Sequence, residues 1–303
     1  MPPIIGVFRP KFLTLPLVCI FAGYAVSLGH FTQASWLDLM LVIILGLTAH
    51  ISVNAFNEYF DFKSGLDFTT KRTPFSGGSG TLVNAPHLAN TAKTLAVAAL
   101  VVTSVSGLLL VWRHGWQLLT LGLIGVAVIY TYTQYLNRSP WLCLIAPGIG
   151  FGLCMTLGAA WVLSGHLHPG AWIMATLMTL LVVNLLLLNQ FPDVNADRAI
   201  GRRHFPIVFG LRTSARLFAL LHTIAFLLVP VAVAGGYLSV GALLGLFAVF
   251  LLGPLLCGVL KRPEAVAHNT ALLGLNVAFI HLLPLLTGLG VLFFRDASYV
   301  IMS

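Results

Sequence analysis

Long apolar segments separated by short polar connections run through the whole chain. The segments 39–47, 95–111 and 174–188 each lie in a stretch close to the roughly 20 residues that span the hydrocarbon core of a bilayer. Most of the connections contain Gly, Pro or small polar residues, as turns between helices do. The pattern predicts about nine membrane-spanning helices, at 12–29, 36–60, 93–112, 116–135, 141–164, 171–190, 215–234, 238–259 and 268–293.

The composition fits a membrane protein. Of the 303 residues, 58% are hydrophobic and 8% are charged, whereas a soluble domain carries about 25% charged residues. Disorder is therefore excluded and a soluble globular enzyme is disfavoured. The N-terminus resembles a signal peptide, but its apolar part continues to spanning length, which favours a retained first helix. We expect an all-α, polytopic membrane protein with a single domain over 1–303.

The basic residues set the expected orientation. With a cytoplasmic N-terminus, all of the sixteen Lys and Arg residues except Arg113 and Arg295 fall on the cytoplasmic side, in agreement with the positive-inside rule. The two longest loops, 61–92 and 191–214, are then cytoplasmic as well, at the inner membrane if the source is bacterial. The formal charge of +8 is thus a topology signal, and the chain has no basic domain for nucleic acid. No obligate protein partner is evident.

The acidic residues are few and clustered. Asp38 and Asp296 lie at the predicted outer boundary, and Glu264 lies in a short inner loop. Solubilising loops do not produce clusters, so we expect the other five acids to build one site from two helices. These five of the eight acids lie at the inner ends of the second and sixth predicted helices: Glu58, Asp61, Asp67, Asp193 and Asp197.

The first acidic cluster follows a helical spacing. Asn54, Asn57 and Asp61 lie at i, i+3 and i+7 and therefore share one face of a helix. Gly65 is expected to end this helix and to let Asp67 turn back toward the same face.

The second cluster has a similar pattern, with Asn189, Asp193 and Asp197 at i, i+4 and i+8. Two acidic helix faces repel each other, and a carboxylate deep in a membrane helix costs about 2.5–3.5 kcal/mol. A divalent cation between them removes this cost, and oxygen ligands favour Mg²⁺ or Ca²⁺ over zinc. The alternative is that the acids cap helix ends and pair with nearby Lys and Arg.

Basic residues accompany both clusters. Lys71 and Arg72 follow the first cluster, and Arg202 and Arg203 follow the second. A metal ion on carboxylates with Lys and Arg beside it is the arrangement that a diphosphate needs, because the cations offset the charge on the leaving group. We predict a diphosphate site. Positive-inside charge alone is the alternative, and it is favoured for Arg212 and Arg216.

Other polar residues have less specific interpretations. The glycine-rich segment 73–80 is a lid, a phosphate cradle or a plain flexible turn. Tyr130 and Tyr132 either contact the diphosphate and an allylic cation or are routine interfacial aromatics.

Several uncharged residues are expected to be structural. His50, His222 and His281 are predicted to be buried and hydrogen-bonded, and Asn184 and Asn276 to form hydrogen bonds between helices. The four cysteines are predicted to be small buried hydrophobes rather than disulfide or metal ligands: Cys19, Cys143, Cys154 and Cys257.

Taken together, the two clusters resemble the two aspartate-rich motifs of the UbiA superfamily of intramembrane prenyltransferases. The segments are 57–67 (NEYFDFKSGLD) and 189–203 (NQFPDVNADRAIGRR), and they are most similar to the menaquinone branch, the 1,4-dihydroxy-2-naphthoate polyprenyltransferases. Arg9-Pro10 and the Tyr-Thr-Tyr at 130–132 add to the similarity, which covers nearly the whole chain.

Two residues depart from the superfamily pattern. Glu58 stands where Asp is usual, which weakens its assignment as a direct metal ligand. Arg202 stands where Lys is commoner, which keeps the charge but changes the hydrogen-bonding geometry.

The resemblance implies a fold, a reaction and site residues. The fold is about nine helices around a central cavity open to the cytoplasmic side, with motif 54–67 in the N-terminal half and motif 189–203 in the C-terminal half. The reaction is Mg²⁺-dependent transfer of a polyprenyl group from a prenyl diphosphate to an aromatic acceptor for quinone biosynthesis. The implied metal ligands are Asp61, Asp67, Asp193, Asp197, Asn57 and Asn189. The implied catalytic residues are Asp61, Asp193, Lys71, Arg72 and Tyr130. The implied diphosphate-binding residues are Asn57, Lys71, Arg72, Asn189, Arg202 and Arg203.

Two other functions stay open at this point. An intramembrane terpene cyclase uses the same site chemistry, with the substrate's own double bonds capturing the cation, and is told apart by product formation without an acceptor. A cation-coupled transporter is disfavoured because the acids lie at helix ends beside basic loops rather than at mid-membrane.

Overall fold

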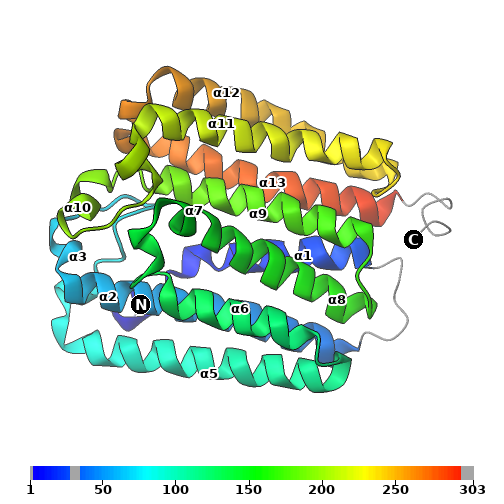
Figure 1. Cartoon of the computed structure of the whole chain (residues 1–303), viewed down its shortest axis with the longest axis horizontal. Helices are drawn as coiled ribbons and strands as arrows, with labels where there is room; N and C mark the ends of the chain where they lie inside the picture. Colours follow the sequence, from blue (N-terminus) through cyan, green and yellow to red (C-terminus); the bar gives the residue numbers. More distant parts are fainter. Residues whose placement is uncertain (1–2, 28–34, 295–303) are drawn as a thin grey trace.

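The computed structural model describes residues 3–27 and 35–294, in which all regular elements are helical. Figure 1 shows long helices lying side by side in one bundle, with α5 at one edge and α12 at the other, and with α3 and α10 at the same end. The helices that build the bundle are α1 (Thr14–Ser27), α2 (Trp36–Ser64), α5 (Ala89–His114), α6 (Leu118–Thr131), α7 (Pro140–Gly148), α8 (Gly158–Ser164), α9 (Pro169–Asn189), α11 (Phe205–Ala234), α12 (Val249–Lys261) and α13 (Thr270–Phe293).

Shorter helical elements join or extend these helices. A π-helical stretch, η6, links α7 to α8, and the 3-10 helix η7 leads into α12. The shorter elements are η1 (Pro3–Phe8), η2 (Pro10–Phe12), α3 (Leu66–Thr69), α4 (Thr81–Asn84), η4 (Pro86–Leu88), η5 (Leu136–Arg138), η6 (Ile149–Leu157), α10 (Val194–Ala199), η7 (Val240–Ala248) and η8 (Pro263–His268).

The predicted multi-pass membrane architecture is confirmed in its coarse form. Among the described residues, seven helical stretches are long and apolar enough to cross a bilayer. An eighth forms if Ile4–Phe12 and Thr14–Ser27, which are bent by 42° against each other, count as one span. The remaining predicted span, 116–135, contains α6, whose 14 residues fall short of a bilayer crossing. Nine spans and a cytoplasmic N-terminus therefore stay predictions.

Helix α2 is the scaffold of the first acidic motif. It continues four residues beyond the predicted end, to Ser64, and stops at Gly65, whose left-handed φ of 81° supplies the predicted helix end. At its other end, the fully buried Asp38 completes a capping box with Ser35 and binds Arg113 Nε of α5 at 2.6 Å. The acid expected at the outer boundary thus fastens α2 to α5.

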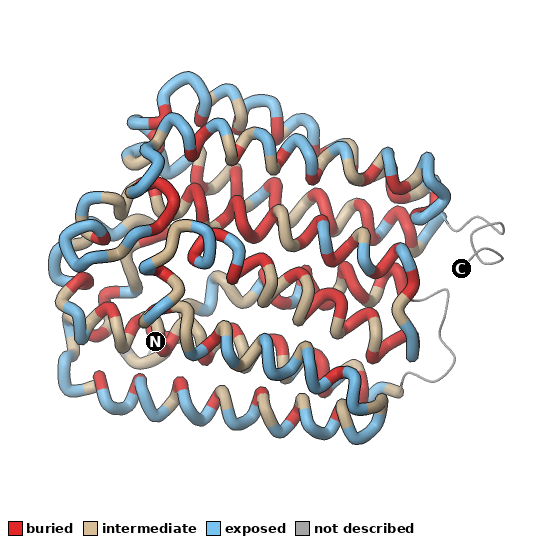
Figure 2. Tube along the Cα trace, viewed as in Figure 1, coloured by how far each residue is buried: buried red, intermediate tan, exposed pale blue. Residues whose placement is uncertain are grey.

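Burial separates the inside of the bundle from its lipid-facing surface. Of the most apolar 18 residues of α9, 67% are buried, whereas the corresponding share of the stretch Pro86–His114 is 28%. Figure 2 shows buried positions in the middle of the bundle and exposed positions along its two edges. Because lipid tails are as apolar as Leu, the exposed Leu, Val and Phe side chains at the edges suit a bilayer rather than water.

The cysteine prediction holds only in part. Cys19 and Cys143 are buried and Cys154 is half-buried, but Cys257 on α12 is exposed. The prediction of burial is therefore wrong for Cys257, because α12 lies at the edge of the bundle and an apolar run does not tell a lipid-facing side from an inward-facing one. None of the four thiols forms a disulfide.

A buried polar network joins α9, α11 and α13, as the sequence predicted for its two asparagines. Asn184 Nδ2 donates to His222 Nδ1 at 2.7 Å, and His222 Nε2 lies 2.8 Å from Asn276 Oδ1. All three side chains are fully buried. The imidazole is the middle link, so its removal leaves both amides without this partner.

We expect His222→Leu to lower the free energy of unfolding by about 1–3 kcal/mol, because two interhelical hydrogen bonds are lost in an apolar interior. The measurement is thermal unfolding of the detergent-solubilised protein, with His268→Leu at an exposed position as the matched control. Equal melting temperatures for the two variants would show that the network carries no stability.

Candidate active site

One large cavity of about 580 Å³ begins at the end of the bundle where α2 and α9 stop. Its polar end is lined by Asp61 and Asp67 from the first motif and by Asp193 and Asp197 from the second. Its lining continues along α2 as far as Val42, which at 1.5 Å per residue is about 28 Å from Asp61. Most side chains along this length, from α2, α5, α6 and η6, are apolar. The cavity therefore has a polar end and a long apolar body.

Local backbone turns bring both motifs to the polar end. After Gly65 the short helix α3 begins, and it carries Asp67 back beside α2 as predicted. The second motif does not form one continuous helical face, because α9 ends at Asn189 and α10 begins only after Asp193. Pro192 lies in the break and has no N–H to continue a helix. Asp193 and Asp197 nevertheless both line the cavity, because the chain re-enters a helical turn between them.

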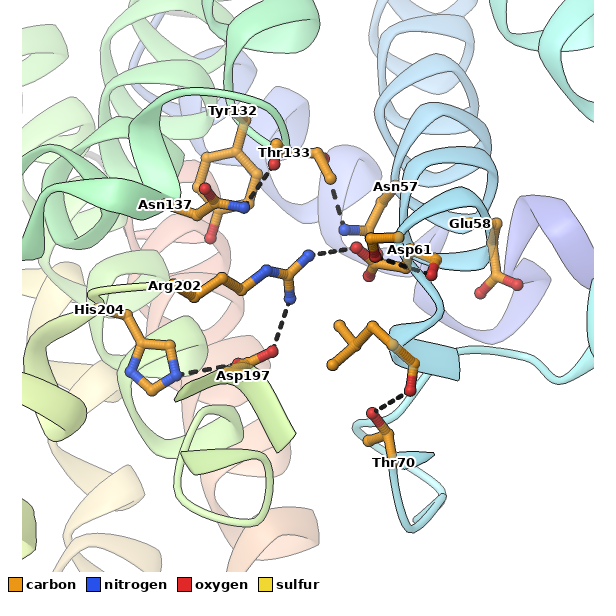
Figure 3. A network of polar contacts seen from close by, with 12 residues as sticks. Asn57, Glu58, Asp61, Thr70, Tyr132, Thr133, Asn137, Asp197, Arg202 and His204 are labelled. Carbon is orange, nitrogen blue, oxygen red and sulfur yellow. Dashed lines mark hydrogen bonds and ion pairs between the residues drawn. The ribbon is translucent and has the colours of Figure 1, made fainter. Parts of the chain in front are cut away.

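Arg202 bridges the two motifs (Figure 3). Its guanidinium donates to Asp61 Oδ1 of the first motif and, at 2.8 Å, to Asp197 Oδ1 of the second. The left-handed Gly201, with φ 83°, turns the chain so that Arg202 points back into the cavity. Burial alone would lower the pKa of Arg202, but the carboxylates of Asp61 and Asp197 outweigh it and raise that pKa. Asp61 and Asp197 are thus paired with a basic residue, which is one of the two interpretations that the sequence left open for the acidic clusters.

Asp197 is also held from its other oxygen. His204 Nε2 lies 2.9 Å from Asp197 Oδ2, and the imidazole is almost fully buried. Arg203 N donates to the carbonyl of Asn137 at 2.9 Å, which ties the turn to the connection after α6. Sequence analysis did not single out His204. The signal that was available is its position one residue after the basic pair.

Several oxygens at the polar end have no hydrogen-bond partner among the described residues. They are Asp67 Oδ2, Asn189 Oδ1, Asp193 Oδ1 and Gln190 Oε1, and all four are buried from solvent. Burial, assisted by neighbouring carboxylates, raises the pKa of Asp67 to about 7 and that of Asp193 to about 7. A buried oxygen without a hydrogen-bond donor costs free energy. A bound cation would remove this cost. The residues therefore fit a hard, oxygen-liganded metal ion.

The acids are not, however, gathered into one ready ligand group. No three Asp, Glu, His or Cys side chains of the described residues converge in a metal-binding arrangement. The Arg202 guanidinium instead pairs with both Asp61 and Asp197. Two acids are paired with Arg202, and Asp67 and Asp193 keep unpaired oxygens. Four carboxylates around one ion therefore stay a prediction.

Glu58 holds two other segments of the chain against α2. Its carboxylate, fully buried, accepts hydrogen bonds from Arg9 Nε at 2.8 Å, from Ser79 N at 2.6 Å and from Ser79 Oγ at 2.7 Å. Arg9 also donates to Asn57 Oδ1 at 3.1 Å and has an unusual positive φ of 49°. Glu58 thus fastens both the N-terminal segment and the glycine-rich segment 73–80 to α2. These contacts give Glu58 a structural role, whereas the sequence had placed it among the five acids of one site and had weakened its assignment as a metal ligand.

We expect Glu58→Gln to increase the rate of trypsin cleavage after Lys71 and Arg72 at least about tenfold, because losing a charge-assisted hydrogen bond costs about 1.5–3 kcal/mol of loop docking. Limited proteolysis followed by mass spectrometry of the fragments measures this rate. Glu264→Gln removes an exposed acid that pairs with Arg212 and is the control. Equal cleavage rates in the two variants would show that Glu58 does not hold this segment in place.

The other predicted site residues lie in different surroundings. Asn57, Asn189 and Arg202 line the cavity, whereas Lys71, Arg72 and Arg203 are exposed and lie outside its lining. Arg72 does donate to the backbone carbonyl of Asp67 at 3.2 Å.

The structure also distinguishes Tyr130 from Tyr132, and it differs from the prediction for His50. Tyr130 is 48% exposed and packs edge-on against Phe56, and it is Tyr132 that lines the cavity. The side chains at positions 130 and 132 therefore point to different places, a distinction that an apolar helix end does not show in sequence. His50 is buried in the cavity wall, but its Nδ1 has no hydrogen-bond partner among the described residues, contrary to the prediction.

Comparison with known proteins identifies the family. A sequence profile of the UbiA prenyltransferase family matches residues 17–283, which is most of the chain. The chain belongs to the UbiA prenyltransferase family. As a member of that family it is a prenyltransferase enzyme and an integral, multi-pass membrane protein, which confirms the resemblance found in the two motifs.

Named relatives agree with this membership in the UbiA family. The chain is 26% identical over 249 residues to the 1,4-dihydroxy-2-naphthoate octaprenyltransferase of Bacillus subtilis, covering 81% of this chain and 77% of that protein. It is 28% identical over 224 residues to the enzyme of the same name from Escherichia coli, covering 70% of both chains.

Solved structures share the UbiA fold. An apo UbiA homologue from Aeropyrum pernix superposes with a TM-score of 0.70 at 18% identity, covering 91% of this chain and 96% of that chain. A UbiA homologue from Archaeoglobus fulgidus bound to GPP and Mg²⁺ superposes with a TM-score of 0.61 at 12% identity, covering 96% and 99%. At these identities the likeness concerns the fold.

Proposed function

We propose that the protein transfers a polyprenyl group from its diphosphate to an aromatic acceptor of the quinone-precursor type, with Mg²⁺ as cofactor and 1,4-dihydroxy-2-naphthoate as the favoured acceptor. The polar end of the cavity faces the cytoplasm in this proposal, because the basic loops lie there. The observation that carries the proposal is the shape of one cavity: carboxylates from both motifs meet at one end, and an apolar body continues from it. Such a cavity suits a substrate with a charged head and a long hydrocarbon tail.

The metal site is assigned from the unpaired oxygens and the paired acids. Asp67, Asn189 and Asp193 offer oxygens without donors, and Asp61 and Asp197 become available when Arg202 moves away. Hard oxygen donors favour Mg²⁺, which commonly binds one or two carboxylates together with substrate phosphates. When bound, the ion neutralises diphosphate charge and so makes the diphosphate a better leaving group. A homologue from Archaeoglobus fulgidus was solved with GPP and Mg²⁺.

The chain's own residues bind the diphosphate and protect the reacting carbon. Arg202 carries five N–H donors, and a diphosphate is a stronger partner for them than two carboxylates that bind a metal ion. Lys71 and Arg72 neighbour the polar end and add positive charge from outside. The apolar body next to Asn57 keeps water away from the allylic carbon, which water would otherwise trap.

The reaction balances without any other reactant. The bond between the prenyl C1 and the diphosphate oxygen breaks, and its electron pair leaves with the diphosphate. A ring carbon of the electron-rich acceptor forms the new bond to C1, and the ring then loses a proton to recover its aromaticity. The protein has to separate charge and to hold C1 and the ring carbon together, both of which a preorganised site does.

The decisive experiment is product analysis by mass spectrometry. Purified protein receives Mg²⁺, prenyl diphosphates of several lengths and a panel of aromatic acceptors, with EDTA and acceptor-free controls. A prenylated aromatic product that disappears with EDTA is the expected result, and it names the acceptor. A cyclic hydrocarbon or alcohol formed without acceptor would overturn the transferase proposal in favour of a cyclase. No product from folded protein with any acceptor would overturn it as well.

A further inference from the structure

The cavity has a second sector that the diphosphate site leaves unexplained. This sector is bordered by η2, the start of α1, the glycine-rich segment and α13, and Lys11, Thr14, Phe75, Val277 and His281 line it. In Figure 1, α13 lies on one side of α1, and α5 and α6 lie on the other, so the lining of this sector comes from other elements than the apolar lining from α5 and α6. We call these five residues the α13 sector.

The α13 sector contains a cation without an acidic partner. Lys11 Nζ donates to the carbonyl oxygen of Pro74, and no carboxylate of the described residues lies within ion-pair distance of it. The two arginines that line the cavity differ in this respect, since Arg9 pairs with Glu58 and Arg202 pairs with Asp61. Lys11 is exposed, so its ammonium remains available for a bound anion.

The same sector offers a hydrogen-bond acceptor with a defined tautomer. His281 Nδ1 lies 2.8 Å from the carbonyl of Val277, so this nitrogen carries the proton and Nε2 keeps its lone pair. Nε2 accepts from the Thr14 hydroxyl at 3.0 Å. The hydroxyl has an alternative acceptor, the carbonyl of Lys11 at 3.5 Å. A ligand hydroxyl is therefore able to replace Thr14 on His281 without leaving Thr14 unpaired.

The walls of the sector are flat and apolar. Phe75 lies against α13, where a Cβ added at Gly274 would be 3.4 Å from its ring. Val277 follows one helical turn later on the same face. An aromatic wall, a cation and a hydroxyl acceptor together match a hydroxylated aromatic carboxylate, whereas a prenyl chain has no group for His281 to bind.

We propose that the α13 sector binds the aromatic acceptor as a hydroxyaryl carboxylate, with Lys11 pairing with its carboxylate and His281 Nε2 accepting the hydrogen bond of its ring hydroxyl. This inference rests on the proposed transferase function. The hydrogen bond to His281 draws the hydroxyl proton away from the ring oxygen and so raises the electron density of the ring that attacks C1. The ring lies between Phe75 and Val277, and the neighbouring Gly77 and Gly78 of the same loop also line the cavity toward Asp67.

The test separates acceptor binding from diphosphate binding by kinetics. We expect Lys11→Gln to raise the KM for 1,4-dihydroxy-2-naphthoate about tenfold or more, the loss that removing one charge-assisted contact produces. The KM for the prenyl diphosphate should stay within about twofold of wild type, since Lys11 binds the acceptor rather than the diphosphate in this proposal. With 1,4-dihydroxynaphthalene, which lacks the carboxylate, variant and wild type become equal. Lys63→Gln, an exposed lysine of α2 outside the cavity lining, is the matched control.

A binding measurement provides a readout that does not depend on turnover. Fluorescence titration of metal-free protein with 1-hydroxy-2-naphthoate should show about tenfold weaker binding for Lys11→Gln and for His281→Leu than for Lys63→Gln. An unchanged affinity in Lys11→Gln, or a rise in the KM for the prenyl diphosphate instead of the acceptor, would overturn the assignment. If wild-type protein binds the naphthoate but transfers no prenyl group to any acceptor, the proposed function fails while the pocket stands.

Discussion

Asp61→Ala and Asp193→Ala are each expected to lower the rate of prenyl transfer by at least about a thousandfold, because each removes a charged oxygen ligand from the diphosphate-metal site in a water-poor cavity. Asp61 comes from α2, and Asp193 lies in the break between α9 and α10. The measurement is the initial rate of product formation at saturating Mg²⁺ and both substrates.

Both variants should remain folded in the membrane. Asp193 Oδ1 has no hydrogen-bond partner among the described residues, so its loss costs little stability in metal-free protein. Asp61→Ala leaves Arg202 bound to Asp197. Glu264→Gln, at an exposed acid outside the cavity lining, is the control and should retain a wild-type rate. Wild-type rates in the two aspartate variants would refute the metal assignment.

Arg202→Met is expected to lower the transfer rate by about a hundredfold, because the diphosphate loses a preorganised bidentate donor. The same change should lower the melting temperature of metal-free protein, since the buried Asp61 and Asp197 carboxylates lose the cation that bridges them. Added Mg²⁺ should then raise the melting temperature by more than it does in wild type, because the ion no longer competes with Arg202 for these acids.

Melting curves with and without Mg²⁺ measure this difference directly. Arg216→Met, at an exposed arginine of α11, is the matched control and should respond to Mg²⁺ as wild type does. An equal Mg²⁺-induced shift in Arg202→Met and wild type would show that Arg202 and the ion do not share Asp61 and Asp197.

The sequence predicted the helices because hydrophobic length is a local property. A bilayer requires about 20 apolar residues per crossing, so runs of that length identify spans whatever their neighbours are. The expected end of α2 at Gly65 is correct for the same reason, since a left-handed helix cap favours glycine by backbone geometry alone. Helix α6 is where this reasoning is weakest: its helical part is 14 residues long, shorter than the apolar segment 116–135.

The sequence also indicated residues that line one cavity, but not how their charges pair. Helical spacing placed Asn57 and Asp61 on one face, and both line the cavity. Spacing gave the wrong geometry for the second motif, because Pro192 lies in the break between α9 and α10. Which of Tyr130 and Tyr132 faces the cavity depends on the rotation of α6 against its neighbours, a quantity that an all-apolar helix does not encode.

What the sequence alone determined is therefore the membrane class, most helix positions, the two acidic motifs and the family that they indicate, because each follows from local spacing or local composition. Only the tertiary structure decided which charges meet. Arg202 and Asp61 are 141 positions apart, and Arg9 and Glu58 are 49 apart, yet each pair forms an ion pair. Charge pairing in a low-dielectric interior is set by distance in space, and that distance exists only once the helices have packed.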